Sequence, residues 1–209
     1  MSTDLLTLTQ WLSPAFPTGA FGWSHGLEAF VAGDEVNDRA TFEVWLSDVL
    51  RFGAGGSDAV LLAATLAGGD VGTMADLARA MTSSAERLDE TLAQGAAFAR
   101  TLRALGHDIE DLPMPVAVGL AARQLSVAPA DVIALYLQGF ATNLTQIAVR
   151  MGLFGQSDGQ MVLTALTPLI GEIAQHALAC DPDEITTFTL RADLMAMRHE
   201  GQETRLWRS

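Results

Sequence analysis

The sequence predicts an all-α fold, a single-domain bundle of about nine or ten helices. Apolar residues recur at three- and four-residue spacing along most of the chain, and turn-forming residues separate the segments that show this spacing. Sustained period-two alternation is not found; residues 186–190 have strand propensity, but a single strand would have no partner. The 209 residues are enough for one domain with a substantial buried core.

Six helices are expected in the first half of the chain, with boundaries set by capping and helix-breaking residues. Ser24 is the expected N-cap of the second helix, and Asn37-Asp38 offers a cap for the third. Glycines interrupt the third helix from Gly53 onward, after which Ser57-Asp58 starts an apolar fourth one. Small residues around Gly95 let another helix approach the sixth closely. The six expected segments are residues 3–12, 24–32, 37–52, 57–66, 71–81 and 83–106.

The second half of the chain contains helices separated by proline- and glycine-rich turns. Pro129 is well placed as the first residue of a helix that ends near Met151. Ser157 and Gln160 have the spacing of a capping box, and Pro168 kinks or restarts the helix that they begin. The expected segments are residues 116–126, 129–151, 157–180 and a final stretch that carries Leu190, Leu194 and Met197, followed by an irregular tail at 202–209.

The composition excludes several classes of partner and chemistry. The formal net charge is −13, so the chain repels the phosphates of nucleic acids and anionic membranes. All twelve basic residues are arginine, which excludes a P-loop lysine and Schiff-base chemistry. No stretch approaches the roughly 18 unbroken apolar residues that a membrane-spanning helix needs. We expect a cytoplasmic protein whose apolar residues serve its core and its contacts with other proteins.

Neither a catalytic centre nor a metal-binding centre is apparent in the sequence. The four histidines are far apart, and the single cysteine, Cys180, precludes an internal disulfide. His176 and Cys180 are four residues apart on a helix, so a weak two-ligand metal site competes with a core cysteine beside a surface histidine. A nucleophile motif and a phosphate-binding loop are both missing. We therefore expect no enzymatic activity, no cofactor and no resident metal ion.

The segment from Ser13 to Glu28 combines turn-forming residues with large aromatic rings. Pro17 and Gly19 indicate a tight turn, and Glu28 falls in the first turn of the next helix, where the helix dipole favours an anion. Turns are normally polar, so apolar rings in this one are expected to pack against something. Two interpretations stay open: a loop that fills the core, or a binding loop. The rings belong to Phe16, Phe21 and Trp23.

The helix expected at 129–151 is apolar on most sides but carries one polar ridge. Asn143, Gln146 and Arg150 follow each other at three- and four-residue spacing. A buried polar ridge must be hydrogen-bonded, line water or meet a partner. A simple exposed edge of the helix is the other interpretation.

Four motifs, in order along most of the chain, resemble those of the UreF family of urease accessory proteins. They are Pro-x-Gly-x-Phe-x-x-Ser-x-Gly-Leu-Glu, a weaker echo of Ser-Leu-Gln-x-Gly-x-x-Phe, Leu-Gly-Gln-x-x-Gly-Gln after an Ala-x-Arg helix end, and His-Glu followed by Arg-Leu-Phe-x-Ser. Phe154 replaces the leucine of the third motif, and Trp207 replaces the phenylalanine of the fourth. The matching residues are Pro17, Gly19, Phe21, Ser24, Gly26, Leu27 and Glu28; Thr91, Leu92, Gln94, Gly95 and Phe98; Ala148, Arg150, Gly155, Gln156, Gly159 and Gln160; and His199, Glu200, Arg205, Leu206, Arg208 and Ser209.

The resemblance implies an all-α, cytoplasmic, non-enzymatic chaperone of urease maturation. It implies a homodimer that binds the accessory protein UreD, also called UreH, and recruits the GTPase UreG for GTP-dependent nickel insertion into apo-urease. It also implies one domain over 1–209, whose N-terminal helix (1–12) and tail (202–209) extend toward partners. Gating of GTP hydrolysis needs no catalytic residue here, and Arg150 remains open for that role. The residues expected to bind partners are Pro17, Gly19, Phe21, Ser24, Glu28, Arg150, Gln156, Gln160, Arg198, His199, Glu200, Arg205, Leu206, Trp207, Arg208 and Ser209.

Two alternatives from other functional classes stay open. One is a helical regulator that binds a small molecule; a DNA-reading helix with basic residues would favour it, and none is seen in the sequence. The other is a helical enzyme with a polar pocket along Asn143, Gln146 and Arg150. Converging carboxylates with perturbed pKa values in that pocket would favour the enzyme.

Overall fold

The computed structural model describes residues 3–184. Within this range it has nine α-helices, two short 3-10 helices and no β-strand, so the predicted all-α fold is confirmed. The expected final helix, the strand propensity at 186–190 and the C-terminal motif lie outside the described residues. The elements are α1 (Thr3–Trp11), η1 (Ala20–Gly22), α2 (Leu27–Ala32), α3 (Arg39–Phe52), α4 (Ala54–Leu66), α5 (Val71–Ala80), α6 (Ala85–Ala104), α7 (Met114–Ala122), α8 (Pro129–Arg150), α9 (Gln156–Ala177) and η2 (Pro182–Glu184).

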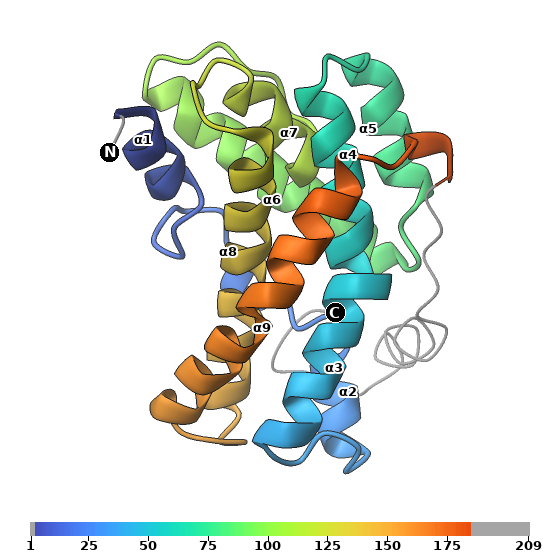
Figure 1. Cartoon of the computed structure of the whole chain (residues 1–209), viewed down its shortest axis with the longest axis vertical. Helices are drawn as coiled ribbons and strands as arrows, with labels where there is room; N and C mark the ends of the chain where they lie inside the picture. The colour runs from blue at the N-terminus through green and yellow to red at the C-terminus, as the bar shows by residue number, and fades with distance from the viewer. Residues whose placement is uncertain (1–2, 185–209) are drawn as a thin grey trace.

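Helix α4 lies at the centre of the bundle, where it contacts α3, α5, α7, α8 and α9. The long helices α8 and α9 run antiparallel to each other, and α3 packs along α9 (Figure 1). Helix α7 joins α6 to the α4 side of the bundle. Because each helix buries its apolar side against these neighbours, one continuous core forms. Its largest fully buried side chains include Trp11, Phe42, Phe98, Leu46, Leu62, Ile133 and Leu137.

Several of the predicted helix starts agree with the structure. Asp38 caps α3: the Thr41 N–H donates to Asp38 Oδ1 at 2.8 Å, and the Thr41 hydroxyl oxygen accepts from the Asp38 N–H. Ser84 caps α6 by accepting a hydrogen bond from the Arg87 N–H at 3.1 Å. Pro129 is the first residue of α8. In each case the sequence places a residue of the right chemistry where the first backbone N–H groups lack helical partners.

The prediction that Ser24 caps α2 is wrong. His25 and Gly26 both adopt positive φ, 52° and 77°, so the chain turns once more before the helix begins. The N-cap of α2 is Gly26, which makes no side-chain capping bond. The Ser24 side chain is instead fully buried, and its hydroxyl has no hydrogen-bond partner among the described residues.

Two other predicted starts are wrong for a common reason. Helix α4 begins directly after Gly53, and α9 begins directly after Gly155, in both cases without a side-chain capping bond. Ser57-Asp58 and Ser157 therefore lie inside the first turns rather than at the caps. Glycine is a favourable N-cap residue, so each helix begins before the polar residues that were expected to cap it. Helix α9 also continues through Pro168 without a restart.

The small centre of α6 is approached by backbone, although not by the helix that was predicted. Gly95 is buried, and a Cβ atom at this position would clash with the carbonyl oxygen of Leu112. Leu112 belongs to the segment that leads into α7, and the Met114 N–H donates to the Thr91 hydroxyl of α6 at 3.2 Å. Glycine at position 95 thus allows the chain before α7 to lie directly on α6.

Two stretches of the described residues have the length and apolar content of membrane-spanning helices. They are residues 39–66, which include α3 and α4, and Pro129–Arg150, which is α8. Their most apolar windows are 67% and 50% buried inside the protein. Core helices of soluble proteins meet the same criteria, and the contacts of α4 and α8 account for the apolar composition of both stretches.

Candidate functional site

The loop from Ser13 to Glu28 both fills the core and presents a ring to solvent. Phe16 and Trp23 are buried, and Phe16 packs against Phe98 of α6 with ring centroids 5.5 Å apart. Phe21, in the 3-10 turn η1, is 65% exposed. Gly19 directly precedes η1 at a φ of 77°, a conformation that favours glycine. Phe16 and Trp23 therefore fit the first interpretation, a loop that fills the core, whereas the exposed Phe21 is available for the second, a binding loop.

The polar ridge of α8 holds this loop in place. The Asn143 side-chain amide donates to the carbonyl oxygen of Ala20 at 2.7 Å, and the Arg150 guanidinium donates to the carbonyl oxygen of Phe21 at 2.9 Å. Between them, Gln146 and Gln156 exchange amide hydrogen bonds of 3.3 and 3.2 Å. The ridge is neither a bare edge nor a set of free polar groups, because its side chains bind backbone of the loop and the start of α9.

These contacts bring two of the four sequence motifs together: the first motif, in the loop, and the third motif, which spans the end of α8 and the start of α9. The Arg150 side chain donates to the backbone of Phe21, and Gln156, at the start of α9, is hydrogen-bonded to Gln146 of α8. Pro17, Gln156 and Gln160 are exposed, and Glu28 occupies the first turn of α2 as predicted. The remaining residues expected to bind partners lie outside the described part of the chain: Arg198, His199, Glu200, Arg205, Leu206, Trp207, Arg208 and Ser209.

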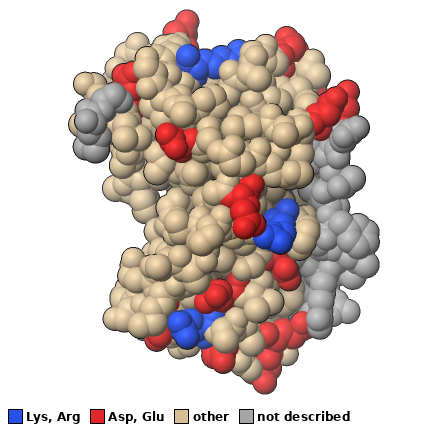
Figure 2. All heavy atoms as spheres, in the orientation of Figure 1, with Lys and Arg blue, Asp and Glu red and all other residues tan. Residues whose placement is uncertain are grey.

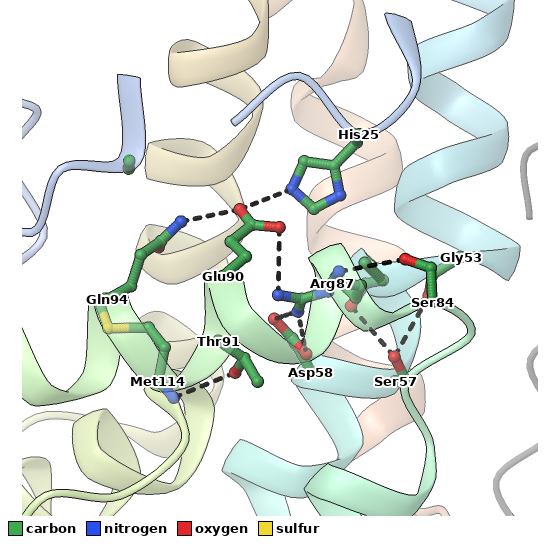
Figure 3. Close-up of polar contacts among 12 residues, drawn as sticks. His25, Gly53, Ser57, Asp58, Ser84, Arg87, Glu90, Thr91, Gln94 and Met114 are labelled. Carbon is green, nitrogen blue, oxygen red and sulfur yellow. Dashed lines mark hydrogen bonds and ion pairs between the residues drawn. The ribbon is translucent and has the colours of Figure 1, made fainter. Parts of the chain in front are cut away.

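A buried network of charged side chains lies behind the loop, and the sequence reading did not anticipate it. Glu90 of α6 is the central residue of this network: its Oε1 lies 2.9 Å from His25 Nε2 and accepts from the Gln94 amide at 2.7 Å (Figure 3). Arg87 extends it by donating two hydrogen bonds to the Asp58 carboxylate, at 2.8 and 2.9 Å. The loop, α4 and α6 are thereby joined through ionic groups.

A tyrosine completes the network from α8. The Tyr136 hydroxyl donates to Asp58 Oδ2 at 2.7 Å, and burial together with the Asp58 charge raises the pKa of that hydroxyl. Burial opposes the charge of Arg87, but the carboxylates of Asp58 and Glu90 hold its pKa above the ordinary value. Tyr136 and Arg87 are therefore fixed hydrogen-bond donors at neutral pH.

The electrostatics of Glu90 stabilise its anion. Burial by itself raises the pKa of this carboxyl, but the nearby His25 and Arg87 charges and the hydrogen bonds from His25 and Gln94 outweigh burial, and the pKa lies below its ordinary value. A lowered pKa suits a permanent anion rather than a group that exchanges protons near neutral pH. This direction argues against Glu90 as the general acid or base of a helical enzyme.

Acid is expected to weaken the fold through Glu90. Because the folded-state pKa is depressed, the ionised carboxylate contributes stability that is present above its unfolded pKa of about 4.3 and is lost as pH falls through the folded value. Urea unfolding measured between pH ~7 and pH ~3 should show this loss. A Glu90→Gln variant should be less stable at neutral pH and lose less on acidification; equal pH slopes for both proteins would contradict the assignment.

The sequence contained a partial signal for this network. Asp58 directly precedes the apolar run of α4, and Glu90 falls on the side of α6 that carries the buried Phe98. Charged residues on an apolar helix face are rarely buried without partners. The sequence analysis interpreted Asp58 as part of a helix cap. Its pairing with Arg87, 29 residues further along the chain, could not be predicted without the fold.

The loop, α6 and α8 enclose a cavity of about 210 Å³. Its walls include loop residues 13–21, and the polar residues that line it are Ser13, Thr18, His25, Glu90, Gln94, Tyr136 and Asn143. A second cavity, of about 490 Å³, lies between the end of α3, the start of α4 and the end of α9. His176 and Cys180 line the second cavity, with His176 Nε2 3.2 Å from Cys180 Sγ. Among residues 3–184, no group of three or more His, Cys, Asp or Glu side chains could hold a metal ion.

The described residues thus define an all-helical protein that uses its buried polar groups to position a surface loop. Comparison with known proteins places the chain in a family: it belongs to the UreF family, whose model matches residues 36–167. A protein of Cereibacter sphaeroides (strain ATCC 17023) named "Urease accessory protein UreF" is 53% identical over 210 residues, which cover 100% of both chains.

More distant relatives carry the same name. The protein of Jannaschia sp. (strain CCS1) is 45% identical over 207 residues, covering 98% of this chain and 94% of its own. That of Brucella ovis is 42% identical over 217 residues, covering 100% and 95%. The family resemblance seen in the four motifs is therefore confirmed. The names describe accessory proteins rather than enzymes, in agreement with the expectation that this chain is not an enzyme.

Proposed function

We propose that this protein is a urease maturation factor. The observation that carries the proposal is the full-length similarity to proteins named as urease accessory protein UreF. The loop on α8 supports it, because Asn143 and Arg150 use their side chains to hold the loop, and the Phe21 ring of this loop is exposed. In this proposal the protein acts in the cytoplasm as one domain over residues 1–209.

The protein works as a homodimeric scaffold that links UreD (UreH) to the GTPase UreG, so that nickel is inserted into apo-urease in a GTP-dependent step. A scaffold that binds one state of a GTPase more tightly than the other shifts the population toward that state by its difference in affinity. Such gating of GTP hydrolysis needs no catalytic group on the scaffold. The N-terminal helix (1–12), the loop, the start of α9 and the tail (202–209) are the proposed contact regions for partners.

The surface of the protein is suited to such contacts. Figure 2 shows a face on which charged side chains are sparse over broad areas, although the whole chain carries a net charge of −13. Helix α9 contributes an exposed strip without any charged residue between Asp158 and Glu172. Depletion of charge is characteristic of the centres of protein interfaces. The strip consists of Gln160, Met161, Thr164, Ala165, Thr167, Pro168 and Gly171.

The proposal is tested by urease activation in cells that express the urease subunits and the other accessory proteins, with and without this protein. Loss of both urease activity and urease-bound nickel in its absence is the expected result, together with co-purification of UreD and UreG. Deleting residues 202–209 should abolish UreD binding, and unchanged binding would refute the role of the tail. Full activation without the protein would refute the proposed function.

The exposed ring of the loop provides a sharper test. Changing Phe21→Ser should weaken partner binding by about tenfold or more, since aromatic hot spots cost on the order of 2 kcal/mol when truncated. Stability should be unchanged, because the ring is 65% exposed. The matched control is Val44→Ser on α3, which removes an apolar side chain that is 64% exposed. Equal binding of the two variants in a quantitative pull-down would exclude Phe21 from the interface.

A further inference from the structure

Two adjoining cavities form one groove along α9. The first is the cavity of about 490 Å³ between the end of α3, the start of α4 and the end of α9. The second, of about 390 Å³, lies between α3 and the middle of α9. Arg51, Phe52 and Glu172 line both cavities, so the two adjoin. This α9 groove follows the helix from Ala165 to Ala177, a length of about 18 Å at 1.5 Å per residue.

The α9 groove has an apolar lining that is open to solvent. Phe52, the last residue of α3, is 48% exposed, and Leu169 of α9 is only partly buried. The other apolar side chains of the lining are Val60, Ala165, Pro168, Ile173 and Ala177. Hydrophobic grooves of this kind receive the apolar face of an amphipathic helix, with anchor residues at i, i+4 and i+7.

The rim of the α9 groove carries an acidic side chain that has no partner. Glu172 is neutralised by Arg51, which lies 3.0 Å away. Asp48 of α3 also lines the groove and is exposed, but its carboxylate forms no ion pair or hydrogen bond with any residue between positions 3 and 184. An occupant with a basic residue at the edge of its apolar face would complement this charge.

The sequence that follows η2 has the apolar pattern that the groove requires. Leu190, Leu194 and Met197 stand at i, i+4 and i+7, in the final helical stretch that the sequence predicts. As a helix, residues 189–198 would be about 15 Å long, which fits within the length of the groove. These residues lie outside the described part of the chain.

The same segment carries the complementary charge. Arg191 and Arg198 are seven residues apart, so on a helix they fall along one edge of the apolar face. Residues 185–209 contain four arginines and three acidic residues, a net charge of +1, whereas the preceding 184 residues carry −14. The segment is therefore attracted to the acidic body of the protein, and one of its arginines can pair with Asp48.

The segment is tethered beside the α9 groove. Cys180 lines the groove, and residue 185 follows only five positions later. Residues 185–188 can extend over about 13 Å, whereas packed helices lie about 8–10 Å apart, so the chain can turn back antiparallel to α9. In this direction Met197 comes level with Ala165. A short tether gives an effective concentration in the millimolar range, so a weak contact is sufficient for occupancy.

We propose that the α9 groove holds residues 189–198 of the same chain whenever no partner protein holds the C-terminal segment. Met197 packs against the middle of α9, and Arg198 lies at the rim beside Asp48. Binding of the C-terminus to UreD then competes with occupancy of the groove. Only this competition rests on the proposed function, in which residues 202–209 bind UreD.

A disulfide introduced between the groove and the segment tests the proposal. In a Cys180→Ser background, Ala165→Cys is combined with Met197→Cys in the full-length protein. Mild oxidation should give an intramolecular disulfide, seen as faster migration on a non-reducing gel. The matched control combines Met197→Cys with Ala104→Cys, an equally exposed alanine at the end of α6, and should react at least tenfold more slowly. Equal rates, or a disulfide that forms only between molecules because a second copy fills the groove, would overturn the proposal.

A charge exchange locates the rim contact. Asp48→Arg and Arg198→Asp should each slow the formation of the disulfide about threefold or more at low ionic strength, and the two changes together should restore the rate. Asp76→Arg, at an exposed aspartate of α5, is the control and should leave the rate unchanged. Equal rates in all four proteins would overturn the placement of Arg198 beside Asp48.

The locked protein tests the competition with UreD. Oxidised protein with the Ala165→Cys and Met197→Cys changes should bind UreD at least tenfold more weakly than the same protein after reduction. Unchanged binding with the disulfide intact would overturn the competition. Full urease activation without this protein would refute the proposed function but would not alter the rate of disulfide formation, so the two proposals fail separately.

Discussion

Replacing Arg87 with methionine is expected to destabilise the fold by about 3–5 kcal/mol. The variant keeps an unbranched chain of similar length but leaves Asp58 and Glu90 without the cation that lies between them. The Arg87 side chain is 13% exposed and that of Asp58 is 7% exposed, so water cannot replace the lost partner. Urea unfolding monitored by far-UV circular dichroism gives the free energy of unfolding for both proteins.

The matched control for this change is Arg79→Met. Arg79 also pairs with an aspartate, Asp76, at 2.9 Å, but the Asp76 side chain is 84% exposed. Exposed ion pairs contribute little, so this variant should lie within about 1 kcal/mol of the parent protein. Adding Asp58→Asn to Arg87→Met should restore part of the lost stability by removing one of the two orphaned charges. A loss of under ~1 kcal/mol for Arg87→Met would show that the network is dispensable.

A single methyl group at Gly95 is expected to destabilise the fold by about 3 kcal/mol. In an exposed helix, Gly→Ala stabilises by up to about 1 kcal/mol, so the sign is reversed here by packing. The new Cβ would clash with the Leu112 carbonyl oxygen and lie 3.0 Å from Met114 N, both backbone atoms. The Thr91–Met114 hydrogen bond holds this segment against α6, so the segment must detach before alanine fits.

Gly171→Ala is the matched control for the glycine prediction. Gly171 is also a helix-interior glycine, on the exposed strip of α9, and its Cβ would have no neighbour within 4 Å. This variant should be more stable than the parent by about 0.5–1 kcal/mol. Thermal unfolding followed at 222 nm compares the three proteins. If Gly95→Ala raised the midpoint as Gly171→Ala does, the close approach of Leu112 would be refuted.

Helical periodicity was sufficient to predict the fold class and most helices. Elements such as α3, α5 and α6 were found close to their predicted bounds, because their caps are side chains with a local hydrogen-bonding role that can be recognised in sequence. The start of α8 was recognised from Pro129, its first residue. The starts of α4 and α9 were placed late because their N-caps are glycines, which make no such bond. A glycine marks a break in the chain without saying on which side of it the helix begins.

The candidate site was predictable only where it is local. The turn at Gly19 and the polar ridge of α8 could both be recognised, since each is defined by neighbours in sequence. Their contact could not, because the bonds from Asn143 and Arg150 span more than a hundred residues and depend on how the bundle closes. The link between His25 and Glu90 spans 65 residues and is inaccessible for the same reason.

The anchoring of the loop also has a consequence for synthesis on the ribosome. Ala20 and Phe21 leave the exit tunnel early, yet the side chains that hold them lie 123 and 129 residues further along. Domains form during translation from the N-terminal end as segments emerge. A nascent or prematurely terminated chain that lacks Asn143 and Arg150 therefore cannot set the loop. The Phe21 ring can therefore take its final position only in chains whose translation has passed the end of α8.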